Sequence, residues 1–487
     1  MLAGFPVTMK SMRLKPLAAC LASMLGLTGT ALATGEAARS GQLPSAHPAQ
    51  VASATVTSCG DEAGANDTLR YAVLVANPYD TIDLSGLACS KITLGSAIAV
   101  TISDLTINGA GADKLTIDGN HVDRVFKHTG TGTLSLSDLS IVNGTFHGGS
   151  ADGGCLYSKG NLVLTHTTVA SCKALGLNSA AGGGAFALKS IILDSSELTG
   201  NEAYASASGL AATLVASGGG ALAVSQAAGD GLTVVHSRVS GNTAHAASGL
   251  AEGGGIFGFN TTVKYSTLSD NHAIAIGNTN NDSGGGAIAA FTSLTMLGTT
   301  VDHNDADVGG GIFISTIADS ATIAQSTISG NKGNLGVGGI YSGVSLDMAN
   351  STIAFNSAPV LSGLVVAGLT ATLNSNIIAD NIPEDLGGAA TFSGEKNLIK
   401  VPGAYIVVPL KTISLDPDLG PLAYNGGLTR THALNAGSPA IDKGNNVSSL
   451  TSDQRGGSYS RVVNINPDIG AFEFDPDHIF GDRFGAP

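Results

Sequence analysis

The chain has 487 residues, of which 67 are Gly and none is Trp; 12% are charged, 5% are aromatic, and the formal net charge at pH 7 is −14. Its mean hydropathy of +0.24 is too apolar for a disordered linker, and the shortage of aromatic residues indicates a core of small β-forming side chains. The negative charge argues against nucleic acid and anionic lipid as partners.

The N-terminus is typical of a secretory signal peptide. Basic residues between positions 10 and 15 precede an apolar run over 17–32, and small residues stand before a cleavage site after Ala33. We therefore expect secretion, or display on the outer surface of a Gram-negative bacterium. The alternative is a lipoprotein signal at Cys20, but a lipobox Cys follows the apolar run, whereas Cys20 lies at its beginning. Because no later stretch has the ~18 apolar residues of a transmembrane helix, we expect no membrane-spanning segment in the mature chain.

The mature chain is expected to begin with a linker and a helical cap. Residues 67–77 predict a short amphipathic helix with Asp67 or Thr68 as its N-cap, followed by a first strand at 80–84. A helix at this position would cover the open end of a solenoid, which otherwise exposes unpaired strand edges.

An eleven-residue pattern recurs from about residue 162 to 381. It runs apolar, x, apolar, x, x, Ser/Thr, x, apolar, x, x, Asn, and its first two apolar positions face the same side of a strand. The copies occupy 162–172, 191–201, 232–242, 261–271, 294–304, 321–331, 346–356 and 371–381.

Glycine clusters separate the copies, and each cluster precedes a second short apolar strand, as at 309–314. Such short strands cannot bury a face alone, and nothing of helical length separates them, so stacked coils are the expected solution. The predicted fold is all-β: a right-handed parallel β-helix solenoid with an N-terminal helical cap and an irregular C-terminal capping domain. The expected divisions are 1–33 (signal peptide), 34–58 (linker), 59–90 (N-terminal cap), 91–382 (β-helix), 383–475 (C-terminal anchor-type or capping domain) and 476–487 (tail).

The Asn that ends seven of the eight copies predicts a ladder of side-chain amides at one turn. The alternative is that Asn merely tolerates a left-handed backbone conformation there. The ladder residues are Asn201, Asn242, Asn271, Asn304, Asn331, Asn356 and Asn381.

Four cysteines remain after the signal peptide. An even number in an exported chain favours disulfides, and the close spacings favour Cys59–Cys89 and Cys155–Cys172 over the other two connectivities. Four buried free thiols are the alternative. Cys172 occupies the Asn position of its copy, so a bond to Cys155 would join a turn to a neighbouring strand.

The helix before the first strand, the Gly-Gly-Gly-Ile-Phe element at 309–313 and the Ser-Thr-Ile-Ser-Gly-Asn element at 326–331 resemble bacterial pectate-lyase-like β-helix proteins that are secreted or surface-bound. They are also similar to polymorphic outer-membrane repeats. The segment from Gly420 to Glu473, with its Gly-Ser-Pro-Ala-Ile-Asp and Asp-Ile-Gly-Ala-Phe-Glu elements, resembles a choice-of-anchor domain. We expect Arg–carboxylate pairs to hold that segment together as a cap.

The outward positions of the repeat contain few charges. Glu197 beside Arg238 predicts a surface ion pair worth ~0–1 kcal/mol, and Asp302 stands two coils beyond Arg238. Asp302, Asp305 and Asp307 would suggest a Ca²⁺ site with Asp270 or Asp282. The glycine-spaced Asp repeat of calcium-binding nonapeptides is missing, so we expect no required cofactor.

These observations favour a structural or adhesive surface protein without catalysis, whose partner is a polysaccharide or cell-surface glycan. The alternative is a polysaccharide lyase or glycoside hydrolase acting on acidic polysaccharide, with Arg238 and Asp302 as the first residues to test. That alternative depends on the fold, which is weak evidence for function.

Overall fold

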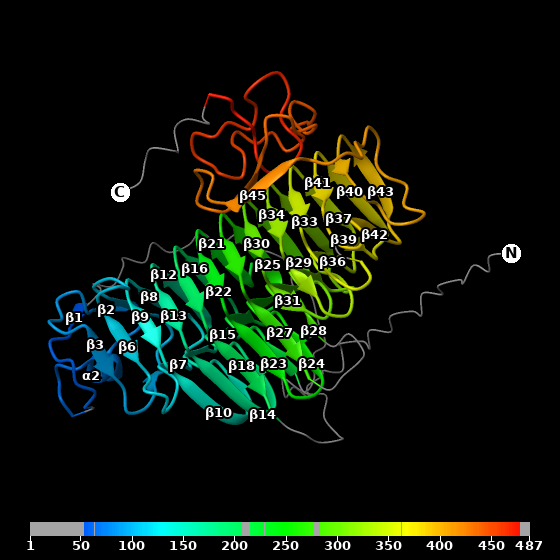
Figure 1. The fold of residues 1–487 in the computed structure, drawn as a ribbon. Helices are drawn as coiled ribbons and strands as arrows, with labels where there is room; N and C mark the ends of the chain where they lie inside the picture. Colours follow the sequence, from blue (N-terminus) through cyan, green and yellow to red (C-terminus); the bar gives the residue numbers. More distant parts are fainter. Residues whose placement is uncertain are drawn as a thin grey trace, which may run out of the picture. The chain divides into compact units, whose positions relative to one another are not determined.

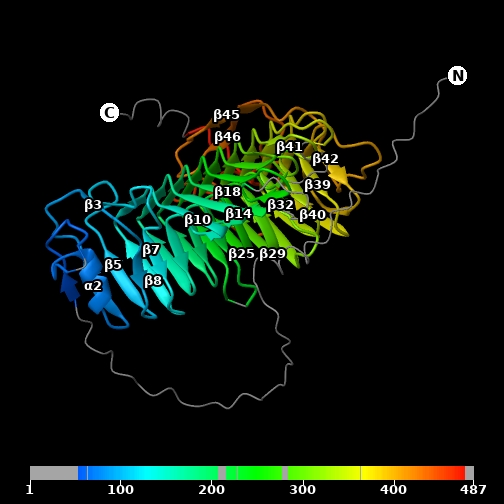
Figure 2. The same ribbon diagram turned by 90° about the horizontal axis from the view of Figure 1, so that it is seen from below.

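A computed structural model describes residues 53–477 of the chain, apart from 63, 207–214, 228, 277–282 and 362. They belong to one compact unit, Gln50–Pro487. Within this unit the chain winds into a stack of parallel β-coils (Figures 1 and 2). The expected signal peptide with its cleavage site at Ala33, and most of the tail, lie outside the described residues.

Sheet A is the largest sheet of the described residues and receives two strands from most coils, because a bend divides each pass of the chain. Its 22 strands are β1 (Ser53–Thr55), β2 (Asp80–Asp83), β4 (Ile98–Val100), β5 (Leu105–Asn108), β7 (Phe126–His128), β8 (Thr133–Ser137), β11 (Leu156–Ser158), β12 (Asn161–Thr165), β15 (Ala185–Ala187), β16 (Ile191–Asp194), β20 (Ala221–Ala223), β21 (Leu232–Val235), β25 (Ile256–Lys264), β29 (Ile288–Leu297), β32 (Ile312–Ile314), β33 (Ser320–Ala324), β36 (Ile340–Ser342), β37 (Leu346–Ala349), β39 (Leu364–Val366), β40 (Thr370–Asn374), β42 (Leu386–Gly388) and β43 (Thr391–Glu395).

Sheet B receives one short strand per coil. Its 12 strands in the described residues are β3 (Lys91–Thr93), β6 (Thr116–Asp118), β9 (Ser140–Val142), β13 (Thr168–Ala170), β17 (Glu197–Thr199), β22 (Arg238–Ser240), β26 (Thr267–Ser269), β30 (Thr300–Asp302), β34 (Thr327–Ser329), β38 (Thr352–Ala354), β41 (Ile377–Ala379) and β44 (Leu398–Ile399). Their parallel register confirms the expected stacking of equivalent strands.

Sheet C projects from the middle coils. Its ten strands in the described residues are β10 (Thr145–Asp152), β14 (Lys173–Ala181), β18 (Glu202–Ala205), β19 (Val215–Ser217), β23 (Thr243–Ala246), β24 (Leu250–Glu252), β27 (His272–Ala275), β28 (Ser283–Gly284), β31 (Asp305–Ala306) and β35 (Lys332–Gly333). An outgoing strand such as β18 and the returning strand β19 lie face to face. Between them is an alanine cluster, whose small side chains allow the two layers to pack closely.

The core of the solenoid forms as the repeat predicts. Leu162 and Leu164 point inward from β12, Val169 points inward from β13, and all three are buried in one cluster that runs the length of the coils. The alternating burial of β12 follows directly from the two-residue period of a strand.

The turns between strands use left-handed residues at fixed positions. One such residue stands directly before each hydroxyl position of the repeat, as His166 and His236 do, and another stands directly before the Asn position, as Gly200 and Gly241 do. The third left-handed residue of a coil is the first Gly of its glycine cluster, for example Gly182. A residue with a side chain would be strained at this positive φ. The left-handed residue is therefore the neighbour of the ladder Asn, and the alternative explanation for the recurrent Asn is wrong.

The Asn residues lie in a continuous ladder inside one turn. Each Nδ2 donates to the next Oδ1, for example from Asn304 to Asn331 at 2.9 Å and from Asn331 to Asn356 at 2.9 Å. The Cys172 backbone N–H donates to Asn201 Oδ1 at one end, and Asn381 Nδ2 donates to Asp385 Oδ1 at the other. The remaining links join Asn201 to Asn242, Asn242 to Asn271, Asn271 to Asn304 and Asn356 to Asn381.

A second ladder runs through the hydroxyl position of the repeat. The backbone N–H of Thr167 donates to Ser196 Oγ, and the N–H of Ser196 donates to Ser237 Oγ, both at 3.0 Å. The sequence indicated a bend at this position but not the interaction between coils.

Both disulfides have the favoured connectivity, Cys59–Cys89 and Cys155–Cys172. Helix α2 (Leu69–Val75) has Thr68 as its N-cap and packs on β2 and β4. Parallel pairing extends beyond the expected limits of the solenoid, because β1 pairs with β2 before residue 91 and β41 pairs with β44 after residue 382. Isolated bridges to residue 413 continue the last coil.

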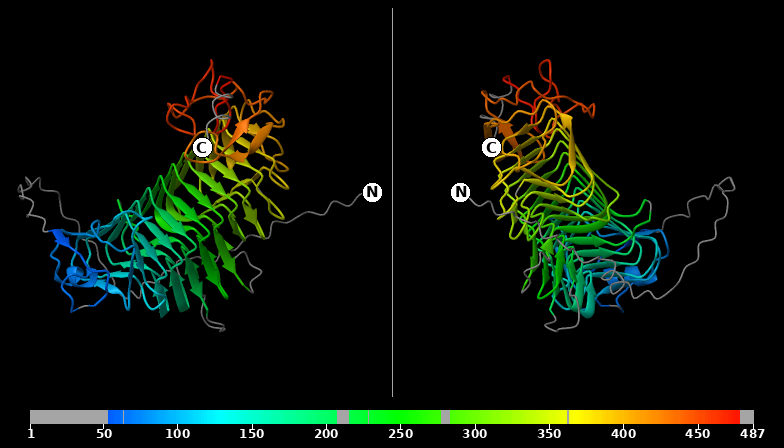
Figure 3. Two further views of the ribbon diagram at one scale, coloured as in Figure 1. Left: turned by 60° about the vertical axis from the view of Figure 1, so that its left-hand side comes forward. Right: turned by 90° about the vertical axis from the view of Figure 1, so that its right-hand side faces the viewer.

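The C-terminal segment, residues 419–477, lies along the outer face of sheet B rather than over the end of the last coil (Figures 1 and 3). It contains the antiparallel pair β45 (Leu419–Ala423) and β46 (Thr431–Leu434). The expected Arg–carboxylate pairs are present: Arg455–Asp453 at 2.8 Å and Arg461–Glu473 at 3.1 Å. The expectation that this segment caps the end of the solenoid was therefore wrong. The strand pattern of the repeat shows which side chains face outward, but it does not show which of these side chains a distant segment will cover.

Candidate functional site

Asp302, which the sequence placed on an exposed face, is fully buried beneath the C-terminal segment. Its two carboxylate oxygens accept hydrogen bonds from Arg430 Nη2 at 2.7 and 2.5 Å, and one is 2.7 Å from His303 Nδ1. Burial raises the pKa of Asp302, while its contacts with His303 and Arg430 act in the opposite direction. Asp302 is thus a structural anchor that no large substrate can reach.

Arg238 is exposed on β22, where Glu197 and Thr267 are its register neighbours on the adjacent strands. Among the described residues, neither Arg238 nor Glu197 belongs to an ion pair within 4.0 Å, so the expected surface pair does not form. Arg238 and Asp302 also lie in different environments, since one faces solvent and the other the C-terminal segment. The structure therefore does not bring the two sequence candidates together.

The aspartates suggested as Ca²⁺ ligands point to separate partners. Asp305 contacts His272 and raises the pKa of that imidazole, while Asp307 Oδ2 accepts from the backbone N–H of Ser283. Asp282 lies outside the described residues. Across the part of the chain that the structure describes, no three His, Cys, Asp or Glu side chains are grouped as metal ligands.

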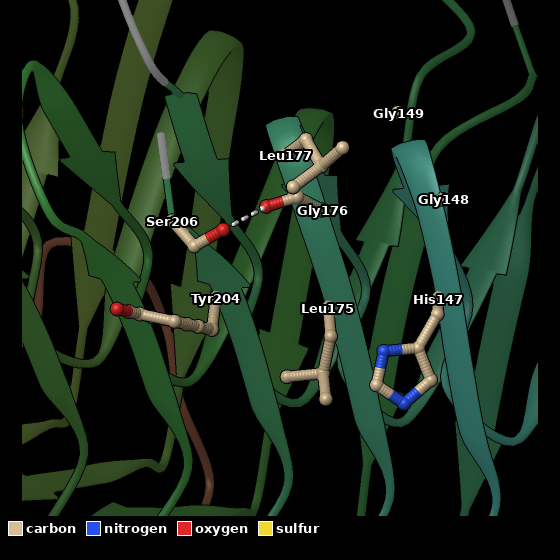
Figure 4. Close-up of a pocket in the computed structure, with 8 residues that line it drawn as sticks. All are labelled: His147, Gly148, Gly149, Leu175, Gly176, Leu177, Tyr204 and Ser206. Carbon is tan, nitrogen blue, oxygen red and sulfur yellow. Dashed lines mark hydrogen bonds between the residues drawn. The ribbon is translucent and has the colours of Figure 1, made fainter. Parts of the chain in front are cut away.

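The outer face of sheet C has an open hollow of about 570 Å³ that the sequence did not reveal (Figure 4). His147 of β10, Leu175 of β14 and Tyr204 of β18 lie side by side across three neighbouring strands, in register. Leu177 lies further along β14, and Ser206 directly follows the end of β18. The remaining lining residues are Gly148, Gly149 and Gly176.

Glycines open this hollow. The pairing of β10 with β14 shifts register between Gly148 and Ser150, so the strands separate locally. At Gly176 a side chain is excluded, since a Cβ would lie 1.7 Å from the carbonyl oxygen of Ser179. Ser206 Oγ donates to the Gly176 carbonyl at 3.2 Å, which fixes the hydroxyl at the rim.

The row of the hollow continues along the sheet. His245 of β23 pairs with Tyr204, and Ile274 of β27 pairs with His245. The Tyr204 and His245 rings are 4.7 Å apart, and their planes are tilted by 51°. We call the five side chains His147, Leu175, Tyr204, His245 and Ile274 the sheet C strip.

A row of charged residues borders the strip toward the solenoid. Lys173 Nζ is 2.9 Å from Glu202 Oε2, and His272 is paired with Asp305. The charges of this row therefore compensate one another, and the strip itself contains no Lys, Arg, Asp or Glu. Chemically, the arrangement offers apolar and aromatic surface with a few polar atoms at the rim, which suits a flat organic ligand.

Comparisons with known proteins give no family. No protein-family model matches the chain, and no curated protein matches it either. Among solved structures, the crystal structure of pectate lyase Pel9A is similar with 11% sequence identity and a TM-score of 0.33, over 88% of this chain and 98% of that one. The parallel β-solenoid is established by the strand pairing itself.

The inner corner between sheets A and C contains the other unusual groups. Outward residues of sheet A form an aromatic row here, including the stacked pairs Tyr157–Phe186 and Phe313–Tyr341, of which all but the half-buried Tyr157 are buried. Glu252 of β24 is buried, and burial raises its pKa to about 8. Because the corner is tightly packed, we interpret it as structural.

The sequence did contain a signal for sheet C. After three of the ladder Asn residues, alanines alternate with other residues: Glu202-Ala-Tyr-Ala, Thr243-Ala-His-Ala and His272-Ala-Ile-Ala. The alanines form the inner layer, and Tyr204, His245 and Ile274 are the residues between them. This two-residue period identifies the outward side chains directly.

Proposed function

We propose that this protein is an exported glycan-binding protein that acts without catalysis, and that the sheet C strip is its binding surface. The described part of the chain has no helix with the length and apolar character that a membrane span requires. A signal peptide over residues 1–33 would deliver the chain to an oxidising compartment, where the bonds Cys59–Cys89 and Cys155–Cys172 are stable. In this proposal the protein is secreted or bound to the outer surface of a bacterium.

The observation that supports glycan binding most strongly is the hollow between His147 and Tyr204, with Leu175 as its floor. The C–H faces of a sugar ring gain dispersion energy against such surfaces, and the negative face of an aromatic ring attracts the weakly positive C–H groups. The hydroxyl of Ser206 and the backbone of Gly148 and Gly149 supply polar contacts at the rim. The described lining residues include no carboxylate, so they do not provide the paired acids of a glycosidase.

The test uses the full exported chain. A glycan array followed by calorimetry should identify a bound glycan, and Tyr204→Ala should weaken that binding at least tenfold while Tyr204→Phe retains most of it. Tyr265→Ala is a matched control, because Tyr265 also stacks on a His side chain, with ring centroids 5.5 Å apart, but on another face. Melting temperatures would verify that both variants remain folded.

Three results would contradict the proposal. The first is glycan binding that is equally sensitive to Tyr204→Ala and Tyr265→Ala, and the second is the absence of any bound glycan. The third is the release of reducing ends or unsaturated sugars on prolonged incubation, which would show catalysis. Export is tested separately: mass spectrometry of the exported protein should find an N-terminus at Thr34.

A further inference from the structure

We infer that the glycan held by the sheet C strip is an uncharged chain of several sugars that lies along the solenoid axis, with one ring per strand. This inference rests on the proposed glycan-binding function and specifies its ligand. It assigns binding to five neighbouring coils rather than to the hollow alone.

The spacing of the strip determines the orientation. His147, Leu175, Tyr204, His245 and Ile274 come from five neighbouring strands, and each is in register with the next. Parallel strands are about 4.8 Å apart, so the strip extends roughly 19 Å perpendicular to the strands. Side chains repeat along this direction at about the width of one pyranose ring. Across the strip, the same surface is only about one or two side chains wide.

Exposed apolar residues continue the strip beyond the hollow. Ile274 and Ile276 are 37% and 52% exposed at the end away from His147, while Leu177, which lines the hollow, is 62% exposed. A single sugar in the hollow between His147 and Tyr204 would leave the isoleucines in water. A longer chain would cover them, which makes the association more favourable in proportion to the apolar area removed from water.

Charge excludes acidic chains. Two bordering cations are already engaged, Lys173 with Glu202 and His272 with Asp305, and the strip contains no Lys or Arg side chain that could pair with a uronate carboxylate. The net charge of −14 would also repel a polyanion at long range. A neutral chain incurs neither cost.

The two ends of the strip differ. Strand β10 is the first strand of sheet C and pairs with β14 alone among the described strands, so a glycan can extend past His147. At the other end β31 and β35 have only two residues each, Asp305 and Lys332 continue the charged border, and no paired residue of either strand continues the strip beyond Ile274. Binding should therefore gain from added sugars until about five strands are covered.

The experiment measures calorimetric affinity for β-1,4-linked glucose, xylose and mannose oligomers of one to six units, beside oligogalacturonates of the same lengths. We expect at least one neutral series to bind, with affinity rising at least threefold per added sugar up to about five units, and the uronates to bind at least tenfold more weakly. Ile274→Thr should weaken binding of the longest neutral oligomer at least threefold and leave the dimer unchanged. Ile192→Thr is the matched control, since Ile192 is 39% exposed on a strand of sheet A.

The outcomes separate the two proposals. Affinity that stops rising after one or two sugars, a preference for uronates, or equal effects of Ile274→Thr and Ile192→Thr would overturn the axial neutral chain and leave glycan binding intact. If the wild-type protein binds no glycan at all, both proposals are overturned.

Discussion

Replacing Asn331 by Ala should destabilise the solenoid by about 3 kcal/mol. Asn331 is fully buried. Its Oδ1 accepts from the backbone N–H and the Nδ2 of Asn304 at 3.0 and 2.9 Å, and its Nδ2 donates to Val301 O and Asn356 Oδ1 at 3.0 and 2.9 Å. Leaving the Asn304 N–H without an acceptor costs about 1–3 kcal/mol. The other lost bonds cost less, because Asn304 Nδ2 and Asn356 Oδ1 keep further partners.

The measurement is urea unfolding followed by far-ultraviolet circular dichroism, since the chain has no Trp to report by fluorescence. Asn334→Ala is the control. Asn334 lies three residues further along, its side chain is exposed, and its loss should change the free energy of unfolding by less than about 0.5 kcal/mol. If Asn331→Ala also stays within that range, the ladder does not stabilise the fold and the reasoning is refuted.

An aspartate in the middle of the ladder provides a second test of the same reasoning. Asn331→Asp keeps an acceptor for the Asn304 N–H but turns an oxygen toward Val301 O and Asn356 Oδ1, which are both acceptors. We expect it to be as destabilising as Ala at neutral pH and less so in acid. Asp385 occurs naturally only where the ladder ends, and there its second oxygen accepts from the Val401 N–H.

Three further predictions concern stability. The double variant Cys155→Ser, Cys172→Ser removes a disulfide between residues 17 positions apart. Its free energy of unfolding in urea should be lower by about 3 kcal/mol, and reductant should no longer change that value. Between pH 4.5 and about 8 the folded protein keeps a proton on Glu252 that the unfolded chain has lost. Stability should therefore fall by up to about 5 kcal/mol as pH rises through this window, and Glu252→Gln should abolish that part of the dependence; an unchanged slope would contradict it. Arg430→Ala should cost roughly 3 kcal/mol by leaving buried Asp302 without its main cation, with faster amide exchange over 429–434 by mass spectrometry; unaltered exchange would show that the pair does not anchor the segment.

The solenoid could be predicted because its signal is local and repeated. The two apolar positions at Leu162 and Leu164 determine a strand face, and the Asn at the end of each copy determines a turn, so eight imperfect copies support one another. Sheet C could have been predicted in part from its alternating alanines. It was missed because alanine contributes little to an apolar pattern, although two thin layers can pack only with side chains of that size.

The position of the C-terminal segment could not be predicted from the same pattern. Thr168 and Thr327 occupy equivalent outward positions of sheet B, yet Thr168 is half-buried at the surface and Thr327 is fully buried, with its hydroxyl donating to Gln454 Oε1 at 2.6 Å. That contact joins residues 127 positions apart. A strand period specifies which side chains face outward, but the atoms that cover them come from elsewhere in the chain.

The difference between facing outward and being exposed also explains why Asp302 was proposed as a site residue and the uncharged residues of the sheet C strip were not. Asp302 attracted attention as an isolated carboxylate on an outward face, and an isolated carboxylate is stable in a protein interior only when a cation is brought to it. Arg430 supplies that cation. Tyr204, His245 and Ile274 have no buried charge to compensate and no segment among the described residues that pairs with them in the same way. An outward apolar row that the described residues leave uncovered is either stabilised by a partner or tolerated in water, and its regular spacing along five strands favours a partner with a matching repeat.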